Sequence, residues 1–259
     1  MRRLAMLLLA LMLTGCLACA EGLSAPDVRA EGVYNDIDQL RGRTIGSATG
    51  TTYDQIVRRW LPDAKFNYYN TYADMIQALE SGKIAAFACD EPVLRSMMAE
   101  NSRLTMLPQY LDTFEFGYIF GKDARGAALS AQMSEMIRDM RASGELSALN
   151  DKWLSGGMND AEMPDIDALS GENGRLTLAL DALNPPFEFV RDNRFAGLEV
   201  DLALRFCQRF GYGLTIENMD FDAVLTSAQT GRADFACSTI SITDERKESV
   251  DFSVPYHGT

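Results

Sequence analysis

Histidine is almost absent from this sequence, and with it much of the chemistry that hydrolytic and metal-dependent enzymes use. The one histidine, His257, is accompanied by no Ser/His/Asp arrangement and by no residues at metal-ligand spacing. General acid or base catalysis needs a group that titrates near neutral pH. We therefore expect no catalytic residues, no metal and no cofactor.

Cysteines available for cross-linking are few. Of the five, Cys16 and Cys19 lie close to the N-terminus, while Cys89, Cys207 and Cys237 each fall within an apolar helix or strand pattern. Five cysteines in an exported chain suggest disulfides at first. The apolar surroundings of the last three instead favour small buried side chains.

Positive charge is scarce as well. The chain has 24 lysines and arginines against 37 aspartates and glutamates, which gives a formal net charge of -13. Removal of a leader containing Arg2 and Arg3 would make this charge about -15. Such a charge repels phosphate backbones, so we expect no nucleic-acid partner. The hydrophobic fraction of 47% is that of a folded protein, and the length allows two lobes with separate cores.

No apolar run is long enough to cross a membrane as a helix, which takes about 20 residues. The run over residues 4–13 follows two arginines and precedes a processing site, as in a signal peptide. Leu13-Thr14-Gly15-Cys16 resembles the lipobox of bacterial lipoproteins, which implies a signal peptide over residues 1–15, a lipid on Cys16 and a tether over residues 16–35. Cleavage after Ala18-Cys19-Ala20 also fits the small-residue rule. We expect an exported protein, periplasmic or at the cell surface, held at the membrane by the lipid.

From residue 43 strand patterns alternate with helix patterns, which is typical of an α/β fold with mostly parallel sheets flanked by helices. Thr71, with Asp74 three residues on, predicts a helix start. Predicted strands cover residues 44–48, 65–69 and 84–89, and predicted helices cover residues 53–60 and 71–81 and begin again at Glu91.

A second α/β block begins at residue 175, after a predicted linker over residues 157–174. Before the linker, an apolar stretch at 116–120 precedes a helix at 127–141 and a final helix that reaches Trp153. After it we predict a strand at 176–180, a hairpin at Asp192-Asn193 and a helix with apolar positions from Val200 to Phe210.

The two blocks share a helix–glycine–strand pattern. Gly82 leads to a strand that ends before Asp90, and Gly231 leads to one that ends before Ser238. This weak repeat predicts two lobes of similar topology. Open α/β sheets bind ligands beyond the carboxyl ends of their strands, where Asp90 and Ser238 are expected to lie.

A set of motifs carries a family resemblance. In the second block these are Pro185-Pro186-Phe187-Glu188-Phe189, Gly197-Leu198-Glu199-Val200-Asp201, Phe221-Asp222, Gly231-Arg232-Ala233-Asp234, Ile240-Ser241-Ile242-Thr243, Glu245-Arg246-Lys247 and Val250-Asp251-Phe252-Ser253-Val254-Pro255-Tyr256. In the first half they are Leu40-Arg41-Gly42-Arg43, Gly50-Thr51-Thr52-Tyr53, Ala78-Leu79-Glu80-Ser81-Gly82-Lys83, Asp90-Glu91-Pro92, Gly144-Glu145-Leu146 and Lys152-Trp153. They resemble the two lobes of the bacterial extracellular solute-binding proteins of family 3, which bind polar amino acids for ABC transporters. The resemblance implies a two-lobe, type II periplasmic-binding-protein-like fold.

The lobes stand in reversed order relative to that family, in which the lobe with the arginine comes first. Here the Gly-Thr-Thr lobe covers residues 36–120, returning helices cover 121–156, and the arginine-clamp lobe covers 175–259. A circular permutation would account for this order, because termini at the surface tolerate it. A fragment of a larger or tandem protein, or half of a swapped pair, would account for it too.

The resemblance assigns Arg246 to the ligand carboxylate, and its planar guanidinium suits bidentate pairing. Without the motif it would be interpreted as a solvated charge in the run 244–247. Ser241, together with backbone groups of Ser238 and Thr239, is expected to add hydrogen bonds to the ligand.

On the opposite lobe, Thr51 and Thr52 lie at a strand-to-helix turn, where backbone N–H groups and the helix dipole favour an anion. Asp90 is expected to accept hydrogen bonds from the ligand ammonium. The competing interpretation is that Asp90 is a helix N-cap. Asp181 matches a position that contacts the ligand in the family. The alternative interpretation is a simple turn aspartate.

Aromatic positions complete the expected site. Phe221 and Phe187 resemble wall positions of the family, although Phe187 also fits the core. Asn184 replaces the usual stacking aromatic, which indicates a more polar or smaller ligand.

The resemblance implies capture of a small amino-acid-like molecule by hinge closure and delivery to an ABC transporter permease. A ligand-sensing module of a larger membrane protein is the alternative, and a cleft enzyme such as a dehydratase is a weaker one.

Overall fold

The computed structural model describes residues 34–156 and 158–258. The predicted signal peptide, the lipidation site Cys16 and all but the last two residues of the predicted tether lie outside these residues. Over the described ranges, no helix combines the length and the apolar character that crossing a membrane requires.

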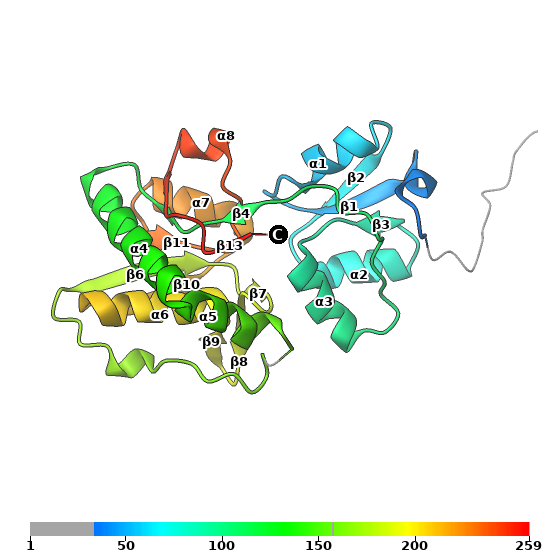
Figure 1. Ribbon diagram of the computed structural model, residues 1–259. Helices are drawn as coiled ribbons and strands as arrows, with labels where there is room; N and C mark the ends of the chain where they lie inside the picture. The colour runs from blue at the N-terminus through cyan, green and yellow to red at the C-terminus, as the bar shows by residue number, and fades with distance from the viewer. Residues whose placement is uncertain (1–33, 157, 259) are drawn as a thin grey trace, which may run out of the picture. The chain divides into compact units, whose positions relative to one another are not determined.

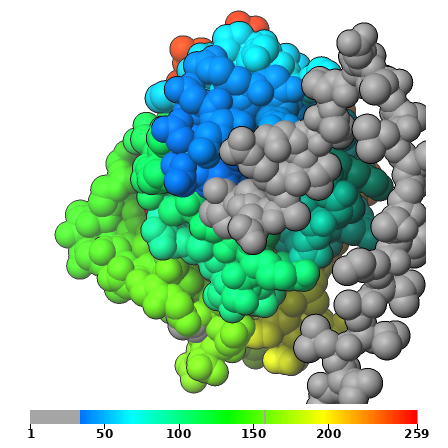
Figure 2. Space-filling model, turned by 90° about the vertical axis from the view of Figure 1, so that its right-hand side faces the viewer, coloured from blue at the N-terminus to red at the C-terminus, as the bar shows by residue number. Residues whose placement is uncertain are grey.

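The first block, residues 34–113, is built on a parallel sheet in the order β2-β1-β3. Its strands are β1 (Thr44–Ala48), β2 (Lys65–Tyr69) and β3 (Ala86–Phe87), and its helices are η1 (Ile37–Leu40), α1 (Tyr53–Trp60), α2 (Tyr72–Glu80) and α3 (Glu91–Glu100). The predicted strand at 84–89 is shorter in the structure, although Ala85 and Ala88 continue the backbone pairing with β1. In Figure 1 these elements are blue to blue-green, and in Figure 2 the same residues form the upper and middle part of the face shown.

The second block, residues 114–156 and 158–258, contains a mixed sheet in the order β10-β6-β11-β5-β12. Its strands are β5 (Ile119–Phe120), β6 (Arg175–Leu180), β10 (Gly213–Asn218), β11 (Phe235–Ala236) and β12 (Asp251–Phe252), with β4 (Glu115–Phe116) paired to β13 (His257–Gly258). Its helices are α4 (Ala124–Ser143), α5 (Glu145–Leu154), η2 (Ile166–Ala168), α6 (Leu198–Phe210), α7 (Phe221–Gln229) and α8 (Asp244–Lys247). β6, β10 and β11 run parallel, while β5 is antiparallel to both of its neighbours.

β5 belongs to the second sheet, whereas the sequence grouped it with the first lobe up to residue 120. Ile119 and Phe120 pair with β11 on one side and β12 on the other, and both side chains are fully buried. An antiparallel strand inserted among parallel ones has both faces covered, so its apolar side chains stabilise it there. The structure therefore joins residues 114–120 to the second block.

A predicted hairpin lies at the edge of this block. β7 (Leu183–Asn184), β8 (Glu188–Arg191) and β9 (Arg194–Ala196) form an antiparallel sheet. The turn residues Asp192 and Asn193 have φ of 50° and 60°, which the short polar side chains of these residue types tolerate. The prediction of a hairpin at this position is confirmed.

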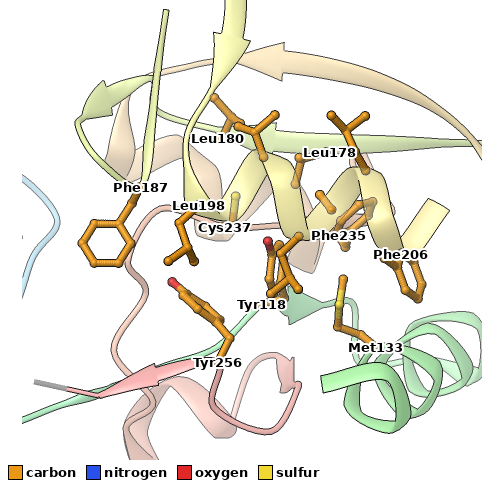
Figure 3. Close-up of a cluster of buried hydrophobic side chains, with 14 of the residues drawn as sticks. Tyr118, Met133, Leu178, Leu180, Phe187, Leu198, Phe206, Phe235, Cys237 and Tyr256 are labelled. Atoms are coloured by element: carbon orange, nitrogen blue, oxygen red, sulfur yellow. The ribbon is translucent and has the colours of Figure 1, made fainter. Parts of the chain in front are cut away.

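The core of the second block is aromatic. Tyr118, Phe206 and Phe235 are fully buried, with ring centroids of Tyr118 and Phe235 6.1 Å apart and those of Phe206 and Phe235 5.9 Å apart. Figure 3 shows these rings with Met133 of α4 and Leu178 of β6. Cys207 and Cys237 are buried free thiols, as predicted, while Cys89 is a half-buried one.

A buried carboxylate fixes α5 to α6. Asp201 is fully buried and pairs with Lys152 at 2.6 Å and with Arg205 at 2.7 Å, and it also accepts a hydrogen bond from the Trp153 indole nitrogen at 3.1 Å. Because a buried charge is tolerated only when it is paired and hydrogen-bonded, this cluster makes the docking of the returning helix specific.

Candidate functional site

A pocket with an empty volume of about 640 Å³, including its part open to solvent, takes walls from both blocks. On the first block it is lined by residues at the end of β1 and the starts of α1 and α2. On the second block it is lined by residues after β6, in β7, at the start of α7, in the turn before α8 and in α8 itself. The lining residues are Ala48, Thr49, Thr51, Thr52, Tyr53, Asn70, Thr71, Tyr72, Met75, Asp181, Leu183, Asn184, Asp220, Phe221, Asp222, Thr239, Ser241 and Arg246. This position beyond the carboxyl ends of parallel strands is where open α/β sheets bind ligands.

Arg246 is the one cation among the described lining residues. Its Nη1 donates to the Ser241 carbonyl oxygen at 3.1 Å, and it forms no ion pair with any residue of the described ranges. Burial lowers the pKa of Arg246 below its ordinary value. A half-buried guanidinium with free donors is poised for an anion from outside the protein.

The Gly-Thr-Thr turn faces the same pocket. Gly50 has φ of 80°, and the Thr51 hydroxyl donates to the Ala48 carbonyl oxygen at 2.7 Å. Thr52 is the N-cap of α1, but its side chain makes no capping hydrogen bond. Thr51 and Thr52 therefore line the pocket with a helix N-terminus that has no side-chain cap, in keeping with an anion site.

An acidic wall lies on the second block. Asp181 follows β6 and is 6% exposed, and Asp220 and Asp222 flank Phe221 at the start of α7. Burial, followed by the charge of Asp220, raises the pKa of Asp181 to about 6, while a hydrogen bond from the Phe221 backbone opposes this. None of these three carboxylates pairs with Arg246 in the described structure, so the pocket has separate cationic and acidic parts.

Asp90 lies just outside the pocket lining. It occupies the N-cap position of α3, yet its side chain makes no capping bond and instead accepts a hydrogen bond from the Tyr53 hydroxyl at 2.8 Å. Burial raises the pKa of Asp90 to about 6, against the lowering effects of hydrogen bonds from Tyr53 and Thr239 and of the Arg246 charge. Tyr53 lines the pocket whereas Asp90 does not, so the structure does not place the Asp90 carboxylate on the wall itself.

The turn after β11 has a strained backbone. Ser238 and Thr239 have φ of 151° and 46° although neither is glycine, and such conformations occur where surrounding contacts impose them. The Ser238 hydroxyl accepts from the Asp181 backbone N–H at 2.8 Å and is fully buried, so Ser238 supports the wall from behind. Thr239 and Ser241 line the pocket directly.

The two predicted aromatic wall residues occupy different environments in the structure. Phe221 lines the pocket, whereas Phe187 is fully buried with its ring against Phe116 and His257. The structure therefore places Phe187 in the core, as Figure 3 also shows beside Leu198.

Tyr53, Tyr72 and Asp220 line the pocket but were not predicted as site residues. Each stands at or directly before a helix start, and that position was the signal that could have found them. Over the residues that the structure covers, no group of three or more potential metal ligands comes together.

Known proteins match the second block. The family profile of the bacterial extracellular solute-binding proteins, family 3, matches residues 176–259. Residues 176–259, called the family 3 segment below, are similar to this family. The family is described as extracellular solute-binding proteins, ArtP, named below, as an extracellular arginine-binding protein, and TcyJ as an L-cystine-binding protein.

The family 3 segment is shared with curated relatives. The chain is 34% identical over 86 residues to the L-cystine-binding protein TcyJ of Escherichia coli (strain K12), covering 33% of this chain and 32% of that protein. It is 31% identical over 83 residues to the arginine-binding extracellular protein ArtP of Bacillus subtilis (strain 168), covering 32% of each. The chain thus spans about a third of the length of these relatives.

Among solved structures, the chain is similar to an ancestral arginine-binding protein bound to arginine, with 36% identity, 32% of this chain and 38% of that chain covered, and a TM-score of 0.32.

Proposed function

We propose that this protein captures an amino acid, or a similar small zwitterion, in the pocket around Arg246 and delivers it to an ABC transporter permease. The observation that carries the proposal is the half-buried Arg246 guanidinium, which lines the pocket and has no ion pair in the described ranges. The family 3 segment and the relatives named for cystine and arginine binding support it.

The carboxylate of the ligand pairs with Arg246, and the α1 N-terminus at Thr51 and Thr52 adds backbone donors. Ser241 and Thr239 line the pocket beside Arg246 and supply further polar contacts. Asp181 accepts from the ammonium, and Asp90 acts through Tyr53. Phe221 covers the apolar part of the ligand.

Walls from two blocks favour hinge closure as the mechanism. A ligand shifts a conformational equilibrium only through contacts that it gains in one state. A molecule that touches both Arg246 and the Thr51-Thr52 turn gains those contacts when the two walls approach, and the closed form is the one that a permease recognises.

The same proposal covers location and chain order. The N-terminal sequence supports export and anchoring by a lipid on Cys16. The pairing of β4 with β13 and of β5 with β11 and β12 supports a permuted order of the two family lobes, because it places the last strands of the second block beside the segment that leaves the first block.

A thermal-shift screen of the purified protein against the common amino acids, polyamines and short peptides tests the proposal. At a ligand concentration of 100 Kd the free energy of unfolding rises by about 2.7 kcal/mol. We expect one amino-acid class to raise the midpoint selectively, and Arg246→Ala to remove the shift. Arg232→Ala is the matched control, because that side chain is 66% exposed and lies outside the pocket. No shift with any amino acid, or a full shift with Arg246→Ala, would contradict the proposal.

A further inference from the structure

Two glutamates are buried together behind the pocket wall. Glu188 of β8 and Glu199 of α6 are both fully buried. Their Oε2 atoms have no hydrogen-bond partner among the described residues. Burial, followed by the charge of Glu199, raises the pKa of Glu188 well above its ordinary value, which favours the neutral form of Glu188.

Each remaining oxygen of the pair is an acceptor that fixes one pocket segment. Glu199 Oε1 accepts from the Thr239 backbone N–H at 3.0 Å and from the Tyr256 hydroxyl. Glu188 Oε1 accepts from the Asn184 side-chain nitrogen at 2.7 Å. The pair thus supports both the strained turn after β11 and the β7 residue that lines the pocket.

The direction of the Asn184 amide follows from this arrangement. Its nitrogen donates to Glu188 Oε1 and, at 3.4 Å, to the Asp181 backbone oxygen, and both of these are acceptors. A flipped amide would place its oxygen against two acceptors, which is unfavourable. The Oδ1 atom has no partner in the described ranges, although Asn184 is a lining residue.

We propose that Asn184, oriented by the Glu188–Glu199 pair, presents its Oδ1 atom to the pocket and selects a ligand whose side chain ends in N–H donors, an ammonium or a guanidinium. The inference rests on the proposed function and names its substrate class. Asp181 and Asp220 stand on the same wall, so this part of the pocket offers acceptors and negative charge together. Glu188 is a positioning residue, since it acts through Asn184.

The test is calorimetric titration of the purified protein with L-arginine, L-lysine and L-norleucine, which shares the lysine chain but lacks its ammonium. The readout is the ratio of affinities for the better basic amino acid and for L-norleucine, because a change in fold stability alone leaves this ratio unmoved. We expect Asn184→Leu to lower the ratio at least about tenfold, which corresponds to about 1.4 kcal/mol.

Variants at Glu188 separate positioning from packing. Glu188→Gln keeps a donor toward Glu199 and an acceptor toward Asn184, so it retains the ratio. Glu188→Met fills the same space without either group and lowers the ratio. Val190→Ala is the control, because Val190 lies on the same strand, is 54% exposed and lies outside the pocket.

The outcomes distinguish this inference from the proposed function. Two outcomes overturn the inference and leave the proposed function standing. One is an unchanged ratio in Asn184→Leu, and the other is a wild type that prefers L-norleucine to both basic amino acids and loses binding in Arg246→Ala. Binding of no amino acid by the wild type overturns both.

Discussion

Replacing Glu188 with glutamine should remove a pH dependence of stability that the buried pair creates. Burial, followed by the charge of Glu199, raises the pKa of Glu188 well above its ordinary value, whereas in the unfolded chain a glutamate titrates near about 4.3. A folded-state pKa that is raised stabilises the protein fully below the unfolded value, and this contribution is lost as pH rises. At pH values between the unfolded and the folded pKa of Glu188, the native protein therefore holds one proton more than the unfolded chain.

The magnitude follows from linkage. Over the pH range in which native Glu188 stays protonated and an unfolded glutamate is ionised, the free energy of unfolding falls by about 1.4 kcal/mol per pH unit relative to Glu188→Gln, whose side chain at that position does not titrate. Urea denaturation of both proteins over a series of pH values rising from about 4.3 measures this difference. The pKa values of Asp90 and Asp181, raised to about 6, add a slope of the same sign up to that pH. Burial lowers the pKa of His257 and gives an opposite slope, but these groups are common to both proteins and cancel. Parallel stability curves would refute the raised pKa of Glu188.

Three further predictions concern the packing and the site. Gly197→Ala should lower the free energy of unfolding by about 2 to 5 kcal/mol, because φ is 122° and a Cβ would lie 2.2 Å from the Phe187 carbonyl oxygen. Gly231→Ala, with no atom within 4 Å of its Cβ, should lower it by only about 1 kcal/mol. Urea denaturation measures both changes. Asp201→Asn should cost about 3 kcal/mol, because it leaves two cations without their buried partner. Tyr53→Phe should raise the pKa of Asp90 further, because it removes the hydrogen bond from the hydroxyl, and should weaken amino-acid binding in calorimetry.

Each of these predictions would be contradicted by a specific result. Equal losses for the two glycine variants would remove steric contact as the cause at Gly197. Asp139→Asn is the control for Asp201→Asn, because the Asp139 side chain is 58% exposed, and equal effects of the two would contradict the importance of burial. Unchanged affinity in Tyr53→Phe would exclude Asp90 from the site.

Local patterns predicted much of the fold. The strands at 44–48 and 65–69 and the helix at 53–60 coincide with β1, β2 and α1, because their periodicity and capping signals lie within a few residues. The α/β class is confirmed, and residues 176–259 match the profile of the family that the motifs resemble. The Arg246 role, the permuted order and the lipid on Cys16 stay predictions.

Long-range contacts could not be predicted from the same patterns. β5 joins the second sheet through partners more than 100 residues away along the chain, and no local signal encodes that pairing. Glu188 and Glu199 are charged residue types, which ordinarily lie at the surface, so only the three-dimensional structure reveals a buried pair. Asp90 fits the N-cap pattern by position, and its actual partner Tyr53 stands 37 residues earlier.

The central claim is that the Arg246 guanidinium holds the carboxylate of a bound amino acid. The most direct measurement is calorimetric titration of the wild type with the amino acid that gives the largest thermal shift and with its methyl ester, which keeps the ammonium and the side chain but lacks the charged carboxylate. We predict that the ester binds at least about 100-fold more weakly, a difference of about 2.7 kcal/mol typical of a lost charge-assisted hydrogen bond, and that Arg246→Ala binds both equally weakly. Equal affinity of the wild type for the amino acid and its ester would contradict the account.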